Sequence, residues 1–415
     1  MAKIRRVKKG ELGRFNEIVM NAYPGFLRED NKRKEKLLGF IEKMMKEDKR
    51  TGLYGYFDNG EMLGTMRILD LKMNYRNHKI KATGIGLVAV DLLHKKKKIA
   101  RDMLKFYLDY SKRKKANISA LYPFRPDFYN KMGYGYGTPM QQYCFKPDQF
   151  HFSELKNNTV NLTDEDTRKV LDCYREYQES RHGLFDMEKH EIDGLMKSQK
   201  HFKIGYREGK KLTGVMIYRF TAPDSSDSFI NDMTIGFYIY NTPDALRGLN
   251  GYIYTQADQV NNVNLYLQDE DFFRVMRDIR YQPPEQYHGS THKISDSGMM
   301  IMYRMVDLED FFRQIKKVRF SALTRTVRFS AIDTFRGDSS VIVQFRDGLP
   351  HLTGSRRPDV VIEGSIADLS SVLMGSVSLR TMLTLGNITI SNDRYTPEID
   401  NALKTDNRPL CMTAF

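Results

Sequence analysis

The sequence is poor in cysteine and contains no long apolar segment. Its three cysteines, Cys144, Cys173 and Cys411, lie far apart in the 415 residues and have neither the spacing of a metal site nor that of a disulfide framework. No run of about 18 apolar residues is present, so no membrane-spanning helix is expected. The basic start, Met1–Arg6, is not followed by the apolar stretch of a secretory signal. We therefore expect a cytoplasmic protein without a metal.

Length and composition favour a folded protein of two or three domains. Hydrophobic residues make up 40% of the chain, which is too many for a disordered protein. The formal net charge of +14 admits nucleic acid, a membrane surface or a phosphorylated cofactor as an anionic partner. The positive charge is densest at His94–Lys98, with Arg101 close behind. This clustering favours a local anion site over a general coat of charge.

Residues 1–150 alternate between strand and helix patterns. Two apolar runs, Tyr54–Phe57 and Met62–Leu69, flank an Asn-Gly turn, which is a strong hairpin signal. A strand is expected over Ile80–Val90, and an amphipathic helix over about Ala100–Lys114. A short buried strand is expected over Ile118–Tyr122.

Part of this pattern recurs later in the chain. The segments Tyr54–Tyr56 and Gly64–Met66 have counterparts in Ile204–Tyr206 and Gly214–Met216, at the same shift, and a turn separates the two halves each time. A further strand, helix and strand then follow in the same order. We infer a tandem duplication of one α/β unit, with coincidence as the alternative because turn-flanked strands resemble one another.

From about Val306 the pattern changes to that of an α+β domain. Strands are expected over Val318–Val327, Val341–Phe345 and Asp359–Glu363, and a helix over Ile366–Leu373. We therefore expect a third domain in this part of the chain.

The segment Gly86–Arg101 combines a strand, a basic turn and the start of a helix. A turn that enters a helix presents unpaired backbone N–H groups, and the helix dipole adds partial positive charge, so that both favour a pyrophosphate. A run of four lysines is by itself more often a solvated surface or a nucleic-acid contact. Its place between strand and helix, and the motif downstream, favour the pyrophosphate.

Three segments of the chain carry recognisable motifs. The segment Lys95–Ala100 loosely matches the pattern Arg/Gln-x-x-Gly-x-Gly/Ala, with lysines at the first and fourth positions. The segment Phe128–Gly135 resembles a more specific signature, Tyr-x-x-Phe-Gly-Tyr-Gly, with Met132 in place of Phe. Together with Asn21–Phe26, which is similar to an N-terminal element, these segments resemble the GNAT acetyltransferase superfamily and, within it, the Eis (enhanced intracellular survival) family.

The resemblance covers the whole chain and implies an α/β and α+β fold, with tandem GNAT-like units followed by a sterol-carrier-like α+β domain. The domains would be 1–150, which binds acetyl-CoA, 151–300, a degenerate GNAT-like domain, and 301–415, a sterol-carrier-protein-like domain that ends in the catalytic C-terminus. The second unit has Asn241–Asp244 where the lysines would be, so it is not expected to bind acetyl-CoA. A hexamer is implied by the resemblance alone.

The resemblance also implies the site residues. Backbone N–H groups of the fourth strand would hold the thioester and pantetheine of acetyl-CoA, and the basic turn would hold its pyrophosphate. The cofactor-binding residues would be Val88, Ala89, Val90, Lys96, Lys97, Lys98, Ile99, Ala100, Arg101, Phe124 and Arg125. Tyr129 would be the general acid that returns a proton to the CoA thiolate, and the carboxylate of Phe415 would be the general base. The structural alternatives are a core strand, a packed tyrosine and a frayed chain end.

The resemblance therefore implies an acetyl-CoA-dependent N-acetyltransferase that acts on a polyamine or aminoglycoside-like amine by direct attack. The alternatives are a protein lysine acetyltransferase, a nucleic-acid-binding protein and a lipid-binding protein that uses residues 306–415. An acceptor cation could meet acidic side chains, which otherwise are ordinary surface carboxylates. These candidates are Glu29, Asp30, Asp400 and Asp406. No membrane or nucleic-acid partner is expected.

Overall fold

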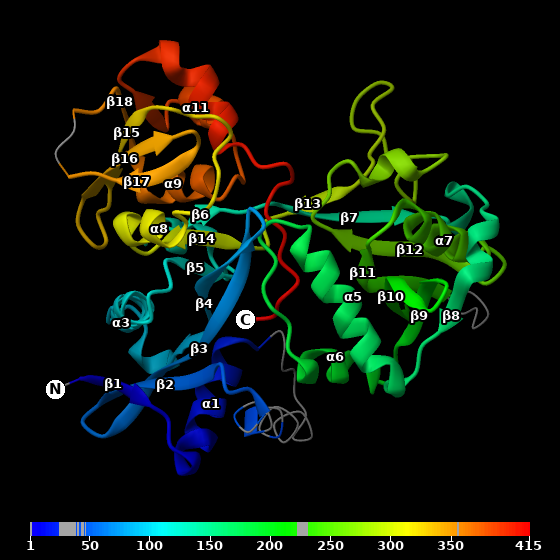
Figure 1. Cartoon of the computed structure of the whole chain (residues 1–415). Helices are drawn as coiled ribbons and strands as arrows, with labels where there is room; N and C mark the ends of the chain where they lie inside the picture. The colour runs from blue at the N-terminus through cyan, green and yellow to red at the C-terminus, as the bar shows by residue number, and fades with distance from the viewer. Residues whose placement is uncertain are drawn as a thin grey trace. The chain divides into compact units, whose positions relative to one another are not determined.

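The computed structural model describes residues 2–24, 39, 41–42, 45, 47–221, 231–354 and 357–415. The described residues form three sheets, and the chain divides into two compact units (Figure 1). The first unit comprises 1–137, 182–185 and 301–415, and the second comprises 138–181 and 186–300. Chain order therefore passes from the first unit to the second and back to the first.

The first unit contains a sheet with the strand order β1-β2-β3-β4-β5-β14-β6. Its strands are β1 Lys3–Arg6, β2 Thr51–Asp58, β3 Glu61–Tyr75, β4 His78–Val90, β5 Ile118–Leu121, β14 Met302–Met305 and β6 Gly135–Tyr136. Neighbouring strands are antiparallel except β4 and β5, which are parallel because a helix, α3, connects them.

Two helices cover this sheet, α1 (Leu12–Ala22) and α3 (Ile99–Arg113). Leu53 and Phe57 of β2 belong to the buried cluster of α1, whereas Tyr54, between them, belongs to that of α3. Because successive side chains of a strand point to opposite faces, the two helices lie on opposite faces of the sheet. The short helix α4 (Pro126–Asn130) and the 3-10 turns η1 (Lys9–Glu11) and η2 (Leu92–His94) complete this part.

The second unit has a sheet with the strand order β13-β7-β12-β11-β10-β9-β8. Its strands are β13 Asp296–Gly298, β7 Met140–Phe145, β12 Val260–Leu267, β11 Asn231–Tyr240, β10 Lys211–Thr221, β9 Phe202–Glu208 and β8 Thr159–Asn161. Its helices are α5 Thr167–Glu179, α6 Lys189–Met196 and α7 Pro243–Tyr254, and its 3-10 turns are η3 Pro147–Gln149, η4 Glu154–Asn158, η5 Asp164–Asp166 and η6 Phe272–Val275.

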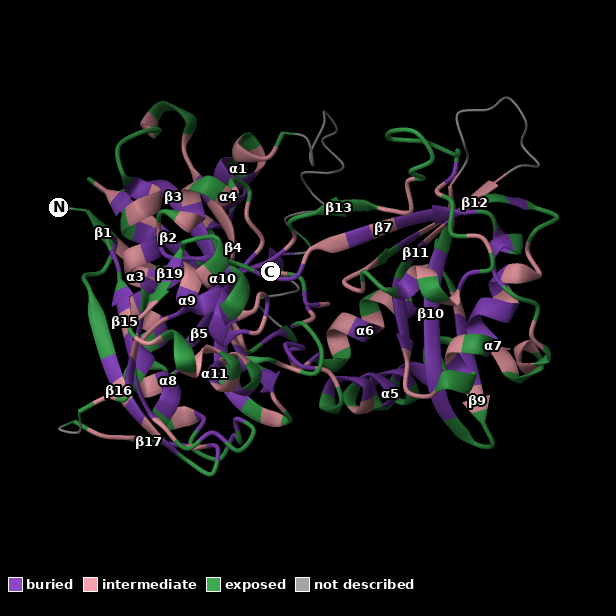
Figure 2. Ribbon diagram, turned by 90° about the horizontal axis from the view of Figure 1, so that it is seen from above, coloured by how far each residue is buried: buried purple, intermediate pink, exposed green. Residues whose placement is uncertain are grey.

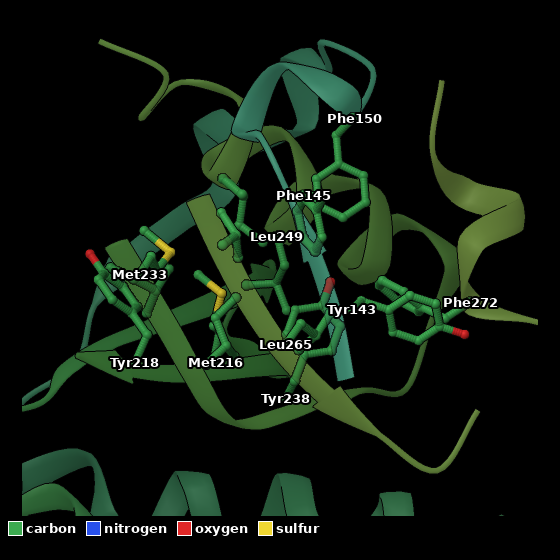
Figure 3. Close-up of a cluster of buried hydrophobic side chains, with 14 of the residues drawn as sticks. Tyr143, Phe145, Phe150, Met216, Tyr218, Met233, Tyr238, Leu249, Leu265 and Phe272 are labelled. Atoms are coloured by element: carbon green, nitrogen blue, oxygen red, sulfur yellow. The ribbon is translucent and has the colours of Figure 1, made fainter. Parts of the chain in front are cut away.

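Packing in the second unit is as expected for a sheet covered by a helix. Side chains from β7, β10, β11, β12 and α7 meet in one core together with Phe150 and Phe272 (Figure 3). The middle of β10 is buried over seven successive residues, from Leu212 to Tyr218 (Figure 2). A strand buried on both faces in this way reads as a nearly continuous apolar run.

The two seven-stranded sheets share one register over the repeated segments. In the first, Tyr54 pairs with Met66 and Tyr56 with Gly64. In the second, Tyr206 pairs with Gly214 and Ile204 with Met216. Both repeats continue with a third antiparallel strand, a helix and a parallel strand. The mixed fold class expected from the sequence, with tandem GNAT-like units, is confirmed.

The rest of the first unit is a five-stranded sheet with the order β17-β16-β15-β18-β19. Its elements are β15 Thr326–Ile332, β16 Ser339–Arg346, β17 Leu349–Leu352, β18 Val360–Ser365, β19 Ile388–Ile390, α8 Leu308–Gln314, α9 Ile366–Leu373, α10 Leu379–Thr384, α11 Thr396–Leu403 and η7 Asp393–Tyr395.

The strand expected over Val318–Val327 is wrong for most of its length. Only Thr326 and Val327 belong to β15, and residues 318–325 have no regular secondary structure apart from a turn at 321–322. Val318, Phe320 and Leu323 are nevertheless buried. The spacing of these apolar residues therefore indicates that they are buried. It does not indicate a strand, because residues of an irregular segment can be buried as well.

Candidate active site

The site begins where β4 and β5 separate. The two strands pair only from Ala82–Ile118 to Ile85–Leu121, whereas β4 continues to Val90. Gly86–Val90 therefore extend past the ladder with β5. A β-bulge lies in this stretch, since Leu87 has a φ of 49° and the register with β3 shifts between Thr65 and Arg67. Such a bulge re-aims the backbone groups of the residues around it.

Beyond β4, the chain forms a pocket of about 550 Å³. Its lining residues come from the end of β4, the basic turn, the start of α3 and the segment around α4. They are Val90, His94, Lys95, Lys96, Lys98, Ile99, Ala100, Arg101, Phe128 and Met132. The structure thus gathers six of the expected cofactor residues around one cavity. Lys97, Val88 and Ala89 are not among its lining residues.

The start of α3 is arranged to receive an anion. Its N-cap residue, Lys98, makes no side-chain hydrogen bond to the helix, so the first N–H groups of α3 are not capped by that side chain. Among the described residues, none of the lysines at 95–98 forms an ion pair. Lys96 and Lys98 have φ values of 65° and 64°. These left-handed conformations explain why the superfamily pattern has glycine at the position of Lys98.

Asp91 fixes the turn from within. Its carboxylate accepts hydrogen bonds from the Leu93 N–H (3.0 Å) and from Nη2 of Arg14 (2.8 Å), and lies 2.9 Å from Nδ1 of His94. The His94 contact, followed by the bonds from Leu93 and Arg14, holds the pKa of Asp91 below its ordinary value. This carboxylate is therefore ionised and engaged near neutral pH, and it leaves the lysines free for another anion.

Tyr129, in α4, is 6% exposed. Its ring contacts those of Phe128 and Tyr134 edge-on, at centroid distances of 5.2 and 6.1 Å. Burial raises the pKa of Tyr129 above its ordinary value, and the nearby Tyr23 and Tyr134 raise it further. No hydrogen bond of its hydroxyl is found among the described residues. A neutral phenol with an unused O–H can donate a proton.

The C-terminal residue lies against β4 of the same unit (Figure 1). A methyl group placed on Gly86 would be 2.4 Å from the carboxyl carbon of Phe415, and one placed on Gly84 would be 2.3 Å from the Phe415 ring. The ring also contacts Tyr122 and Phe185, at centroid distances of 4.9 and 5.7 Å. The carboxyl group thus lies on the backbone of β4 next to the bulge, and the chain end is packed where a frayed end was the alternative.

Other expected residues take ordinary positions. Phe124 is 70% exposed and touches Tyr23 edge-on, and Arg125 pairs with Asp127 at 2.6 Å. The Asp400 carboxylate accepts the Arg380 N–H at the start of α10. Asp406 is exposed, and Glu29 and Asp30 lie outside the described residues, as do Gly25 and Phe26 of the N-terminal element. None of these residues lines the pocket.

Sequence reasoning missed three residues that build the site. The Tyr23 hydroxyl donates to the Val88 carbonyl (2.8 Å), and Tyr122 contacts the chain end. Arg304 is 1% exposed, donates to the Met132 carbonyl (2.7 Å) and pairs with Asp333. Tyr23 belongs to the N-terminal element quoted above, which was the available signal. No sequence signal points to Arg304, because the collision of a methyl group on Gly133 with its guanidinium is visible only in the structure.

The equivalent position in the second unit is closed. The Thr242 side chain caps α7 by accepting the Ala245 N–H (3.1 Å) and donates to the Glu208 carboxylate. The Asn241 side chain donates to the Cys173 carbonyl (3.1 Å). An anion at this helix start would displace a cap and meet a carboxylate, whereas α3 offers an uncapped start and lysines.

Among the described residues, no group of three or more His, Cys, Asp or Glu side chains could hold a metal ion, and no helix is long and apolar enough to cross a membrane. The residues that line the pocket offer cationic side chains, and the start of α3 offers backbone N–H groups, whereas Tyr129 and Phe415 are not among the lining residues.

Residues 3–137 match the family model of the GNAT acetyltransferase domain. No curated protein sequence matches the chain. Solved structures that share the fold over the whole chain include a conserved protein from Enterococcus faecalis V583 described as a probable N-acyltransferase (TM-score 0.82, 17% identity, 100% of both chains). They also include a GCN5-related N-acetyltransferase from Kribbella flavida (0.77, 16%, 100% of this chain and 98% of the other) and Eis1 from Mycobacterium abscessus (0.77, 15%, 100% of both).

Proposed function

We propose that this chain, which contains a GNAT acetyltransferase domain, transfers an acetyl group from acetyl-CoA to an amine of a small polycationic acceptor, of the polyamine or aminoglycoside class. The observation that carries the proposal is the carboxyl group of Phe415 seated on Gly86, beside the bulge of β4. A carboxylate at this place could act as a base, because it lies beside the stretch of β4 where the domain would hold the thioester of acetyl-CoA.

The pocket residues fit the cofactor. The pyrophosphate of acetyl-CoA would lie at the uncapped start of α3, with the side chains of Lys96, Lys98 and Arg101 around it. Backbone N–H groups of Val88–Val90 would hold the thioester and pantetheine, because this stretch of β4 is not paired with β5. When bound, acetyl-CoA supplies the activated acetyl group. Phe124 and Arg125, both exposed, would border it from outside the pocket.

Two groups of the chain would then move protons. The Phe415 carboxylate would accept the proton that the attacking amine loses, and the Tyr129 hydroxyl would donate one to the leaving sulfur. Tyr129 is a candidate for this task because a phenol is protonated at neutral pH and no hydrogen bond of its hydroxyl is found among the described residues. The part of the chain from 301 onward would serve to deliver Phe415 to the first domain, and we do not assign it lipid carriage.

A thiol-release assay with acetyl-CoA and a panel of amines tests the function. The panel contains a polyamine, an aminoglycoside, a lysine-containing peptide and a neutral hydroxyl compound as the blank. We expect release with the polyamine or aminoglycoside. Release with the peptide alone would replace the small acceptor by a protein lysine, and no release with any amine would contradict the proposal.

The role of the chain end is tested by its position. Adding two glycines after Phe415 moves the terminal carboxylate by several ångströms, at about 3.3–3.6 Å for each residue, whereas proton transfer needs about 2.6–3.2 Å. We expect transfer to stop and acetyl-CoA binding to persist. Phe415→Leu, which keeps the carboxylate, should retain partial activity, and the same two glycines at the N-terminus are the control. Full turnover of the C-terminally extended chain would refute the terminal base. Sedimentation would test the hexamer that the family resemblance implies.

A further inference from the structure

The segment Pro409–Phe415 is held at several points along its length. The Leu410 N–H donates to the His182 carbonyl (2.8 Å). Cys411 and Thr413 are 2% and 1% exposed. A chain end normally frays, because few contacts offset the entropy of its residues. The contacts of this segment therefore have to specify where its last residue lies.

Tyr122 contacts the last three residues of the chain at two points. It directly follows β5, at the point where β5 stops pairing with β4. Its hydroxyl donates a hydrogen bond to the Thr413 carbonyl and lies 3.4 Å from the Cys411 sulfur. Its ring meets the Phe415 ring at an interplanar angle of 65°. One side chain thus holds both the backbone before the last two residues and the side chain of the last one.

These two contacts leave the carboxyl group little freedom. With the Thr413 carbonyl fixed, the position of the carboxyl group depends on the backbone torsions of the last residues. The Phe415 ring, between Tyr122 and Phe185 and over Gly84, limits those torsions in turn. The carboxyl group then falls on Gly86.

We propose that Tyr122 is a positioning residue that sets the place of the Phe415 carboxylate, an inference that rests on the proposed base role of that carboxylate. Tyr122 transfers no proton to the acceptor. It acts through the chain end, by a hydrogen bond to a main-chain carbonyl and by a ring contact.

The first test is Tyr122→Phe, which removes the hydrogen bond and keeps the ring. We expect kcat to fall roughly tenfold to a hundredfold, because a displacement of about 1 Å at a catalytic group can cost that much, with the KM for acetyl-CoA unchanged within about threefold. The acid limb of the pH–kcat profile should move to higher pH, since the amine then loses its proton to water. Tyr75→Phe is the matched control, because it removes another tyrosine bond to a main-chain carbonyl, that of Leu373. It should leave kcat and the pH profile unchanged.

The second test is a double-mutant cycle with a chain that ends at Ala414. If Tyr122 acts through Phe415, Tyr122→Phe should lower kcat in the full chain and have no further effect in the shortened one. An equal loss in both backgrounds would overturn the positioning role. If the shortened chain loses activity while Tyr122→Phe keeps full kcat, the positioning role is refuted and the terminal base stands. A shortened chain with full kcat would refute the terminal base and the inference with it.

Discussion

Replacing Gly86 by alanine tests the placement of the Phe415 carboxylate without changing either catalytic group. The added methyl carbon would lie 2.4 Å from the carboxyl carbon and 2.7 Å from the carbonyl oxygen of Phe415. Ordinary contact begins at 3.4 Å, so the carboxyl carbon has to move by about 1 Å, the difference between 3.4 and 2.4 Å. The obstructing atoms are backbone and not the far end of a flexible side chain, so they cannot turn aside by changing rotamer.

We expect Gly86→Ala to lower kcat by about a hundredfold, which is the loss that a displacement of about 1 Å can cause at a catalytic group. The KM for acetyl-CoA should change by less than about threefold, because the cationic pocket at the start of α3 is not altered. The assay is thiol release with a saturating polyamine. A thermal melt of the variant would separate a lost carboxylate position from a lost fold.

The duplication provides a matched control. Gly236 in β11 follows Gly86 at the same sequence shift as the repeated segments, although it lies in a bulge of its own strand, and a methyl group there would meet nothing within 4 Å. Gly236→Ala should therefore keep the kcat of the unmodified protein, although it introduces the same residue into the equivalent strand. If folded Gly86→Ala also retained full kcat, the carboxylate would not need this position, and the reasoning on the terminal base would be wrong.

Three further predictions concern the pocket at the start of α3, the proposed general acid Tyr129 and the buried side chain of His182. Lys96→Ala should raise the KM for acetyl-CoA more than Lys97→Ala does, because of these two lysines only Lys96 lines the pocket. The KM of the unmodified protein should also rise with salt. Equal effects of the two substitutions in initial-rate kinetics would place the pyrophosphate elsewhere. Tyr129→Phe should lower kcat by roughly 10²–10⁴-fold with cofactor affinity kept, and a loss within about threefold would return Tyr129 to a packing role. Burial lowers the pKa of His182 from 6.5 to about 4, so between these pH values the unfolded chain binds a proton that the folded chain does not bind. The free energy of unfolding is therefore unaffected above pH 6.5 and falls by up to about 3 kcal/mol as the pH drops from 6.5 to 4. Urea unfolding of His182→Asn should show a weaker pH dependence in that window, and an unchanged slope would contradict the burial effect.

Local patterns in the sequence were sufficient for much of the fold. Residues 54–56 and 64–66, and their counterparts at 204–206 and 214–216, pair in the same register in the two sheets, because a turn of fixed length and an apolar run determine strand pairing locally. The basic turn was recognisable for the same reason, since it stands between a strand and a helix. The strand expected over Val318–Val327 failed because alternation of apolar residues records burial, and burial does not require a strand.

Only the tertiary structure shows which residues that are distant in the chain come into contact. Gly86, Tyr122, Phe185 and Phe415 converge at one place, yet no spacing or periodicity connects them. Lys97 shares the sequence pattern of Lys96 but does not line the pocket, because the backbone of the turn directs neighbouring side chains differently. Sequence by itself determined the repeated units, the cationic turn and the position of Tyr129 in its motif. The seat of the terminal carboxylate was determined by the packing of the last residues of the chain against β4 and Tyr122, which no local preference of the residues can encode.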